Sequence, residues 1–272
     1  MPEKNPPSKD EAVKELEGHA QEAVQKAQQE VEESRSPWWS VLRKTSFLIT
    51  FDAIMLVLFG ALAAYVHFNA VLNIDVFITQ EFQELRTPWL DVLMTAVSYI
   101  GTSLMLSILL IVVMAVIFWV VNLRLEAIIL IVHTTVSSLL NGLFKAWIGR
   151  PRPTTNLVEI LQAAGGKSFP SGHVMGYVAF WGLLFSFGVI LFKRDRWWHY
   201  VLLIVPALFV ILVGPSRVYL GDHWASDVLG AYMIGLFLLS ITLWIYGRLK
   251  RRGVLEYKHT PAPAKAHPAH SS

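Results

Sequence analysis

The sequence has no cysteine and little charge. None of its 272 residues is cysteine, so disulfide bonds, thiol nucleophiles and cysteine-ligated metals are excluded. Only 16% of the residues are charged and 54% are hydrophobic, which is too apolar for the surface of an ordinary soluble domain. The composition therefore predicts a membrane protein.

The sequence also has no large excess of positive or negative charge. The formal net charge is +3, and the cations occur in short clusters beside apolar runs, so a nucleic-acid partner has little support. Residues 1–36 are polar and lack the basic tip and apolar stretch of a secretory signal peptide. We therefore expect insertion into the membrane through internal spans.

Long apolar stretches recur along the chain. A helix rising about 1.5 Å per residue needs about 20 apolar residues to cross about 30 Å of hydrocarbon. The stretches that meet this length are 46–68, 102–122, 125–144, 172–192, 199–216 and 227–247. The predicted fold is all-α, a polytopic integral membrane protein with six transmembrane helices.

The chain divides into three parts by composition. Residues 1–36 form a polar cytoplasmic extension, whose stretch 10–33 has helix-forming composition but an apolar stripe of mostly Ala and Val. A solvated helix and a partner-binding or coiled-coil role both stay open, as does the oligomeric state. Residues 37–252 form the membrane domain, and residues 253–272 form a tail expected to be disordered.

The connections between spans predict an orientation. Three short basic connections fall on one side of a six-span path: 122–124, 193–196 and 248–252. Cytoplasmic loops carry an excess of Lys and Arg, so this side and both termini are predicted to be cytoplasmic. The opposite side holds residues 74–82 and 89–100, which have helical period and are interrupted by Pro88 and Gly101. We expect them to be amphipathic helices in the outer interface.

Residues 214–227 place serine, arginine, aspartate and histidine between two long apolar runs. Polar groups beside hydrocarbon are costly unless they face a cavity and have a function. On a helix, the four-residue step from His223 to Asp227 lets the carboxylate accept from the imidazole N–H. The other ring nitrogen then stays basic. Asp222 falls on a different helical face and is expected to be a loop or capping residue.

Two earlier segments complete a pattern. Residues 145–153 end one apolar run with three cations, and residues 169–173 open the next with a serine, a glycine and a histidine. Together the three segments resemble the three-part signature of the type-2 phosphatidic acid phosphatase superfamily, which includes vanadium haloperoxidases. The matching residues are Lys145, Arg152, Pro153, Pro170, Ser171, Gly172, His173, Ser216, Arg217, His223 and Asp227. The resemblance covers roughly residues 45–247.

These residue types suit phosphoryl transfer. Cleaving a phosphate ester requires positive groups around the phosphate oxygens, a nucleophile in line and a proton for the leaving oxygen. The phosphate-binding candidates are Lys145, Arg152, Arg217, Ser171 and Gly172, the last two at a helix N-terminus with free backbone N–H groups.

The two histidines are assigned different roles. His223 has the carboxylate partner Asp227 and is the candidate nucleophile, which leaves His173 as general acid. The resemblance implies the same assignment. It further implies a phosphohistidine intermediate, which water hydrolyses with His173 as base, and no requirement for a metal or other cofactor.

Three further ionisable residues lie near or inside apolar runs. Arg150 is interpreted as a headgroup contact or a second-sphere cation. His133 and Asp52 are interpreted as structural groups, a neutral histidine bonded across helices and an aspartate paired near the inner interface.

A polar site at the outer face of the plasma membrane implies a substrate with its head at the interface and its tail in lipid. Candidates are undecaprenyl diphosphate, which we place first, phosphatidylglycerophosphate and phosphatidate. A lipid phosphotransferase with the same intermediate stays an alternative. A vanadate-dependent haloperoxidase is disfavoured because such relatives are soluble. A transporter with Arg217, His223 and Asp227 along its path is the competing class.

Overall fold

The protein is described by a computed structural model covering residues 18, 21–26, 28, 45–192 and 196–255. Its helices are α2 (Thr45–Phe68), α3 (Asn73–Glu84), α4 (Pro88–Thr102), α5 (Leu104–Val120), α6 (Arg124–Ile148), α7 (Gly172–Tyr177), the π-helical turn η2 (Val178–Gly182), α8 (Leu183–Leu191), α9 (Trp197–Tyr219) and α10 (Ala225–Arg251). The described residues contain no strand, which confirms the all-α prediction. Most of the predicted N-terminal extension and of the C-terminal tail lies outside them.

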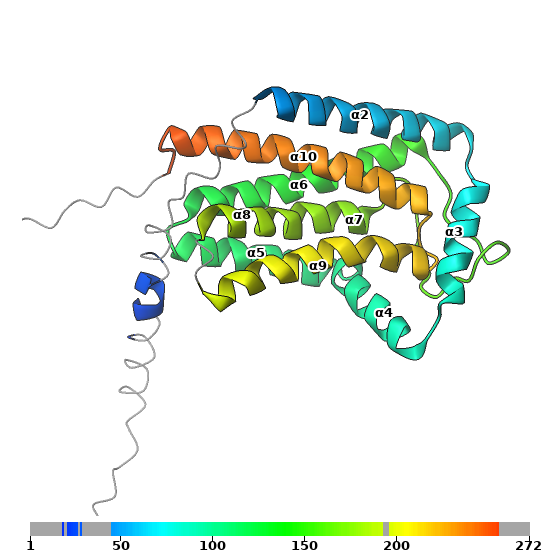
Figure 1. Cartoon of the computed structure of the whole chain (residues 1–272), viewed down its shortest axis with the longest axis horizontal. Helices are drawn as coiled ribbons and strands as arrows, with labels where there is room; N and C mark the ends of the chain where they lie inside the picture. Colours follow the sequence, from blue (N-terminus) through cyan, green and yellow to red (C-terminus); the bar gives the residue numbers. More distant parts are fainter. Residues whose placement is uncertain (1–17, 19–20, 27, 29–44, 193–195, 256–272) are drawn as a thin grey trace, which may run out of the picture.

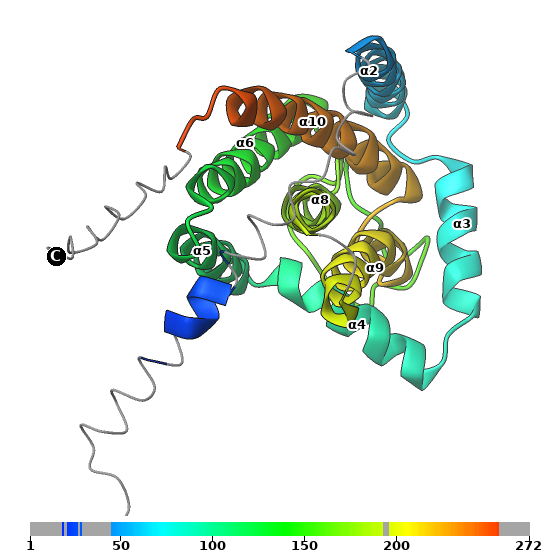
Figure 2. The same cartoon turned by 60° about the vertical axis from the view of Figure 1, so that its left-hand side comes forward.

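The bundle is built around the chain segment α7–η2–α8. Figure 2 looks along the bundle and shows this segment at the centre, with α5, α6, α10 and α9 around it. Of the candidate spans, Gly172–Leu191 is the most enclosed, with 56% of its apolar window buried, against 17% for α2 at the periphery. The first turn of this central segment carries Gly172 and His173 of one motif.

Five helices are long and apolar enough to cross a membrane, and a sixth span is possible if α4 and α5 count together. These two helices are bent by 73°. The break falls at Ser103, which leaves the helical region (φ −89, ψ 106) and whose side chain accepts from the backbone N–H of Leu106 to cap α5. The predicted stretch 102–122 is therefore a 17-residue helix, Leu104–Val120, joined to a bent partner.

The other predicted spans occur as helices, and the last two reach further than hydropathy indicated. Helix α9 continues to Tyr219 and α10 begins at Ala225, so both run through polar residues that an apolar count excludes. Those residues are buried inside the bundle, where other side chains bond to them. His223 thus lies in the short turn between the ends of two long helices.

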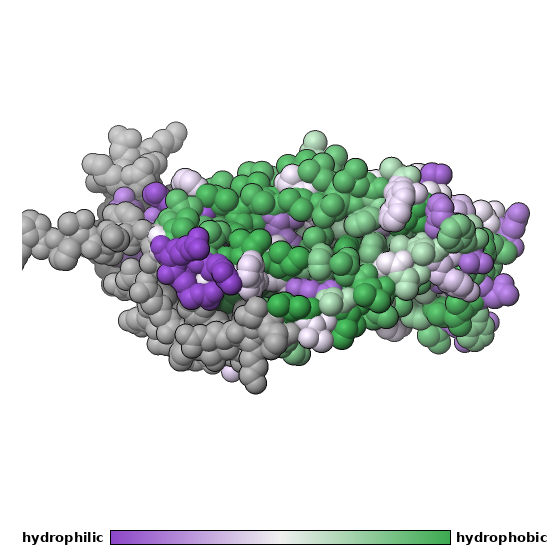
Figure 3. All heavy atoms as spheres, turned by 90° about the horizontal axis from the view of Figure 1, so that it is seen from above, coloured by the Kyte–Doolittle hydropathy of each residue, from purple (hydrophilic) through white to green (hydrophobic). Residues whose placement is uncertain are grey.

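The outer surface of the bundle is apolar. Figure 3 shows a broad band of hydrophobic residues over the middle of the molecule, with hydrophilic residues toward the ends. Large exposed hydrophobic side chains occur on α2, α5, α6 and α9. An apolar surface of this extent, on helices long enough to cross a bilayer, supports a multi-span membrane protein.

The two segments predicted as amphipathic helices, α3 and α4, are helical. They lie at one end of the bundle and cross its direction (Figure 1). The loop 149–171 packs at the same end: Gln83 of α3 donates to the carbonyl oxygen of Glu159 at 2.8 Å, and Arg86 pairs with the Glu159 carboxylate at 2.8 Å. Deeper in the same loop, Phe169 stacks on Phe59 at 5.8 Å between ring centroids, which anchors the loop directly before α7.

Candidate active site

The three motif segments meet at the bundle end that carries α3 and α4. Lys145 lies in the last turn of α6, His173 in the first turn of α7 and Arg217 in the last turn of α9. His223 precedes α10, and Asp227 is the third residue of that helix. Residues separated by up to about eighty positions in the sequence are therefore neighbours in space.

His223 is almost fully buried, with 1% of its surface exposed. Its Nδ1 atom lies 3.4 Å from Asp227 Oδ2 and 3.3 Å from Ser168 Oγ. Asp227 Oδ2 also accepts from the backbone N–H of Trp224 at 2.9 Å, which caps α10. With Nδ1 facing these oxygens, the Nε2 atom of the ring faces the opposite side.

Burial keeps the imidazole of His223 neutral. Loss of solvent lowers the pKa of His223 well below its usual value, and the charges of Arg152, Lys145 and Arg217 lower it further. A lowered pKa means that the ring is unprotonated at neutral pH. With Nδ1 turned toward the carboxylate, its Nε2 atom carries the lone pair, which accepts from Arg152 Nη1 at 3.2 Å.

Arg150 binds the carboxylate oxygen of Asp227 that does not face His223. Its guanidinium is buried and donates to Asp227 Oδ1 at 2.6 Å and to Asp75 Oδ2 at 2.7 Å. Of the two interpretations from the sequence, the second-sphere one therefore fits this geometry. Asp75 also accepts from the backbone N–H of Ser226 at 2.8 Å and is only 1% exposed, so it is not the interfacial side chain that its amphipathic segment indicated.

Two arginines converge on one carboxylate. Arg152 Nη1 lies 2.7 Å from Asp222 Oδ1, and Arg217 Nη2 pairs with Asp222 Oδ2. Asp222 lies in the loop between α9 and α10, as expected, and it is in addition a buried ion-pair partner, 2% exposed. The turn at Gly221 (φ +70) accounts for this, since it reverses the chain directly before Asp222. A Cβ at Gly221 would lie 2.0 Å from the carbonyl oxygen of Glu159, so only glycine fits there.

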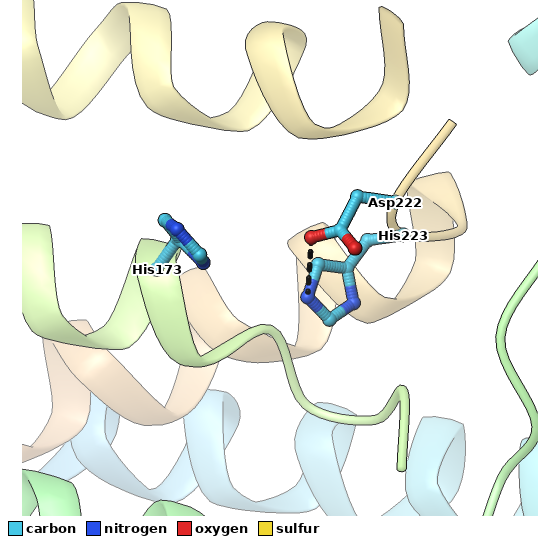
Figure 4. A group of neighbouring side chains, drawn as sticks. All are labelled: His173, Asp222 and His223. Atoms are coloured by element: carbon cyan, nitrogen blue, oxygen red, sulfur yellow. Dashed lines mark ion pairs between the residues drawn. The ribbon is translucent and has the colours of Figure 1, made fainter. Parts of the chain in front are cut away.

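His173 faces His223 and Asp222 from the other side of the site (Figure 4). One ligand-type atom from each of these three residues lies within 4.8 Å of the others. The structure thus brings the two motif histidines together. His173 Nε2 is 3.2 Å from Thr102 Oγ1, which accepts from Gln162 Nε2 at 3.0 Å.

Gln162 connects the histidine to an arginine, because its Oε1 accepts from Arg217 Nη1 at 3.2 Å. Arg217 Nη1 also donates to Ser98 Oγ. Sequence reasoning missed Thr102, Gln162, Ser98 and Ser168. These residues lie outside the three motifs, and their partners are far away in the chain, so no local signal identifies them.

The remaining predicted residues are placed as follows. Lys145 Nζ donates to the carbonyl oxygen of Lys167 at 2.5 Å, which holds it against the loop 149–171. The Ser171 backbone N–H, expected to be free, donates to the carbonyl oxygen of Asp227 at 3.2 Å. Ser171 Oγ is buried and has no hydrogen-bond partner among the described residues. A Cβ on Gly172 would lie 3.0 Å from Asn141 Oδ1, so this glycine allows α7 to approach α6.

A cavity of about 550 Å³ opens beside His173. It runs between α5, α6 and the central segment, and its lining is mostly apolar. Representative lining residues are Leu104, Ile108, Ile111, Phe180 and Trp181. The site thus has a polar end with cations and histidines, and an apolar space next to it.

Fold and site together define a polytopic membrane protein in which two histidines and two arginines are gathered around one carboxylate at one end of the bundle. Comparison with known proteins is consistent with this class. The model of the PAP2 superfamily matches residues 126–251. Phosphatidylglycerophosphatase B of Bacillus subtilis is 34% identical over 197 residues, which cover 71% of this chain and 93% of that protein. The chain belongs to the PAP2 superfamily, which confirms the resemblance found in its three motifs.

Other relatives and a solved structure agree with this assignment. The crystal structure of a transmembrane PAP2 type phosphatidylglycerolphosphate phosphatase from Bacillus subtilis matches with a TM-score of 0.65 and 30% identity, over 74% of this chain and 98% of that one. An undecaprenyl-diphosphatase of Sulfolobus acidocaldarius is 31% identical over 86 residues, which are 31% of this chain and 37% of that protein.

Proposed function

We propose that this protein is an integral membrane lipid phosphatase that hydrolyses a phosphate monoester or diphosphate of a lipid. The observation that carries the proposal is the position of His223: its Nε2 atom lies 3.2 Å from Arg152 Nη1, with Arg217 and His173 around the same space. Membership of the PAP2 superfamily and the apolar cavity beside the site support a lipid as substrate.

The reaction proceeds in two transfers. His223 Nε2 attacks phosphorus, the bond from phosphorus to the lipid oxygen breaks, and His173 gives a proton to that oxygen. Asp227 stabilises the positive charge that develops on the His223 ring. Water then attacks the phosphohistidine while His173 takes its proton, which releases inorganic phosphate and restores both histidines.

The substrate is assigned through the relatives. The relative with the fuller coverage is named for phosphatidylglycerophosphate, and shorter matches are named for undecaprenyl diphosphate and lipid A 1-phosphate. We therefore propose phosphatidylglycerophosphate as the first candidate substrate, ahead of undecaprenyl diphosphate. The apolar cavity would accept part of the lipid chain while the phosphate lies among the arginines.

We further propose that the site faces the outer side of the plasma membrane, with α3 and α4 at that interface. The start of α2 and the end of α10 lie at the bundle end away from α3 and α4 (Figure 1). The last turn of α10 is basic, with Arg248, Lys250 and Arg251, and basic ends favour the cytoplasm.

We propose that the reaction needs no metal. His173, Asp222 and His223 are of a type that can bind a divalent cation, but Arg152 and Arg217 lie in direct contact with this group. Two guanidinium groups repel a divalent cation and attract a phosphate. The cluster is therefore better suited to an anion.

The test is phosphate release from a panel of lipid phosphates by the purified full-length chain in detergent. We expect release from phosphatidylglycerophosphate to persist in excess EDTA. Activity that returns only with added metal would contradict metal independence. Release that requires an acceptor lipid would identify a phosphotransferase, and no reaction with any lipid would refute the proposed function.

A side chain at Gly101 is expected to displace the ring of His173. A Cβ at Gly101 would lie 2.5 Å from His173 Cδ2 and 2.9 Å from Tyr177 Cε2, so Gly101→Ala forces the histidine ring to shift. We expect kcat/KM for the lipid phosphate to fall by about 10- to 100-fold, because small displacements of reacting groups are costly. The matched control is Gly142→Ala, where a Cβ meets nothing within 4 Å. Equal activity of the two variants would contradict the prediction.

A further inference from the structure

Asp222 is a buried carboxylate that the proposed reaction does not use. It lies next to His223 in the chain, in the turn between α9 and α10, and only 2% of its surface is exposed. Its Oδ1 atom is 2.7 Å from Arg152 Nη1, and its Oδ2 atom pairs with Arg217 Nη2. A single carboxylate therefore binds both arginines of the phosphate-binding motifs.

The position of this carboxylate coincides with the position that a substrate needs. Asp222 Oδ2 is 3.6 Å from His223 Nε2, the nitrogen that must approach phosphorus. Figure 4 shows the carboxylate beside this nitrogen, on the side of the ring that faces His173. A carboxylate that bridges two guanidinium groups uses the donors that phosphate oxygens use. Asp222 and a phosphate cannot both occupy these contacts.

We propose that Asp222 is an internal stand-in for the phosphate group. In the empty enzyme its carboxylate neutralises Arg152 and Arg217 and holds them in place. An incoming phosphate displaces it from at least one of them. The inference rests on the proposed function, because it assumes that the two arginines bind the phosphate of the substrate.

The stand-in has two consequences for the enzyme. The buried Arg217 and the partly buried Arg152 would be unfavourable without a counterion, so the carboxylate makes the empty site stable and keeps the donors oriented. It also competes with every anion that enters. Inorganic phosphate, the product, therefore binds more weakly than two arginines alone would bind it, and it leaves the site more readily.

An alternative role for Asp222 makes the opposite prediction. A carboxylate that stays on both arginines while phosphate binds elsewhere on them would act as a positioning residue. Its removal would disorder the arginines and weaken phosphate binding. The direction of the change in phosphate affinity therefore separates a stand-in from a positioning residue.

The experiment compares Asp222→Asn with wild type in detergent. Calorimetry measures the dissociation constants of inorganic phosphate and of sulfate, without turnover. We expect both anions to bind to the variant at least about tenfold more tightly than to wild type. The factor should be the same for phosphate and for sulfate, because in both cases the Asp222 carboxylate no longer competes for the arginines. In the hydrolysis assay, KM for the lipid phosphate should fall and inhibition by phosphate should strengthen. Unchanged or weaker binding of phosphate would refute the proposal.

Two controls keep the outcome decisive. Glu159→Gln removes a carboxylate that is 64% exposed and paired with Arg86, away from the histidines, and its phosphate affinity should equal that of wild type. Asp222→Asn should melt at a lower temperature than wild type, and phosphate should raise its Tm by more. If Asp222→Asn does not fold even in the presence of phosphate, Asp222 is a counterion that the fold requires, and this result would also refute the proposal that it replaces the phosphate group.

Failure of the stand-in and failure of the proposed function can be told apart. The binding measurements need no reaction, so they judge Asp222 alone. If wild type releases no phosphate from any lipid, the proposed function is wrong. If wild type hydrolyses lipid phosphate and Asp222→Asn does not bind phosphate more tightly, only the role of Asp222 is wrong.

Discussion

Replacing His223 by alanine is expected to lower the rate of phosphate release from the lipid phosphate by at least about a thousandfold. The variant loses the proposed nucleophile, a ring nitrogen that lies 3.2 Å from Arg152 Nη1 and close to His173. Arg152 and Arg217, which are proposed to bind phosphate, are unchanged in this variant, so inorganic phosphate should still bind. The measurement is the initial rate of phosphate release, together with calorimetry on the same preparation.

Covalent trapping sharpens this prediction. Rapid acid-free quenching of wild type with a ³²P-labelled substrate should retain label on the protein, and His223→Ala should retain none. His133→Gln is the matched control: His133 is also buried and bonds to a hydroxyl, Thr242 Oγ1, at 2.8 Å, but it lies in the middle of α6. Full activity in His223→Ala would require another nucleophile, and flux of a labelled solute that survives this change would favour a transporter.

The residues predicted from the sequence share one property, namely that each lies in a motif with fixed local spacing. His223 and Asp227 are four positions apart, and the carboxylate lies beside the ring because the chain enters α10 between them. The hydropathy of the spans is local in the same sense, since a run of about 20 apolar residues specifies a spanning helix without reference to other parts of the chain.

The residues that were not predicted depend on contacts between distant parts of the chain. Asp75 has the pattern of an interfacial helix, and only Arg150, 75 positions later, makes it a buried ion-pair partner. Gln162 and Thr102, which join Arg217 to His173, are 60 positions apart. The sequence indicated an interruption at Gly101, between the stretches 89–100 and 102–122, but not the bend of 73° that the two helices make at Ser103.

Replacing His173 by alanine is the second change with a large expected effect on the rate of phosphate release. The size of this effect should depend on the leaving group. In the proposed mechanism His173 acts as general acid and protonates the departing oxygen, which an alkyl phosphate needs because an alkoxide is a poor leaving group. His173→Ala should therefore slow release from phosphatidylglycerophosphate by about 10²- to 10⁴-fold. An aryl phosphate such as p-nitrophenyl phosphate departs without a proton, so the first transfer to His223 should be much less affected.

The second transfer should then limit turnover of the aryl substrate, because in the proposed mechanism His173 acts as base in the hydrolysis of the phosphohistidine. We expect His173→Ala to release a burst of p-nitrophenol equal to the concentration of enzyme, followed by slow turnover. Stopped-flow absorbance measures both phases. The side chain of His173 contacts Thr102 Oγ1 at 3.2 Å, so a loss of packing alone would slow both substrates equally and give no burst. That result would remove His173 from the chemistry, whereas a burst would show that the nucleophile acts without it and that the two histidines have separate tasks.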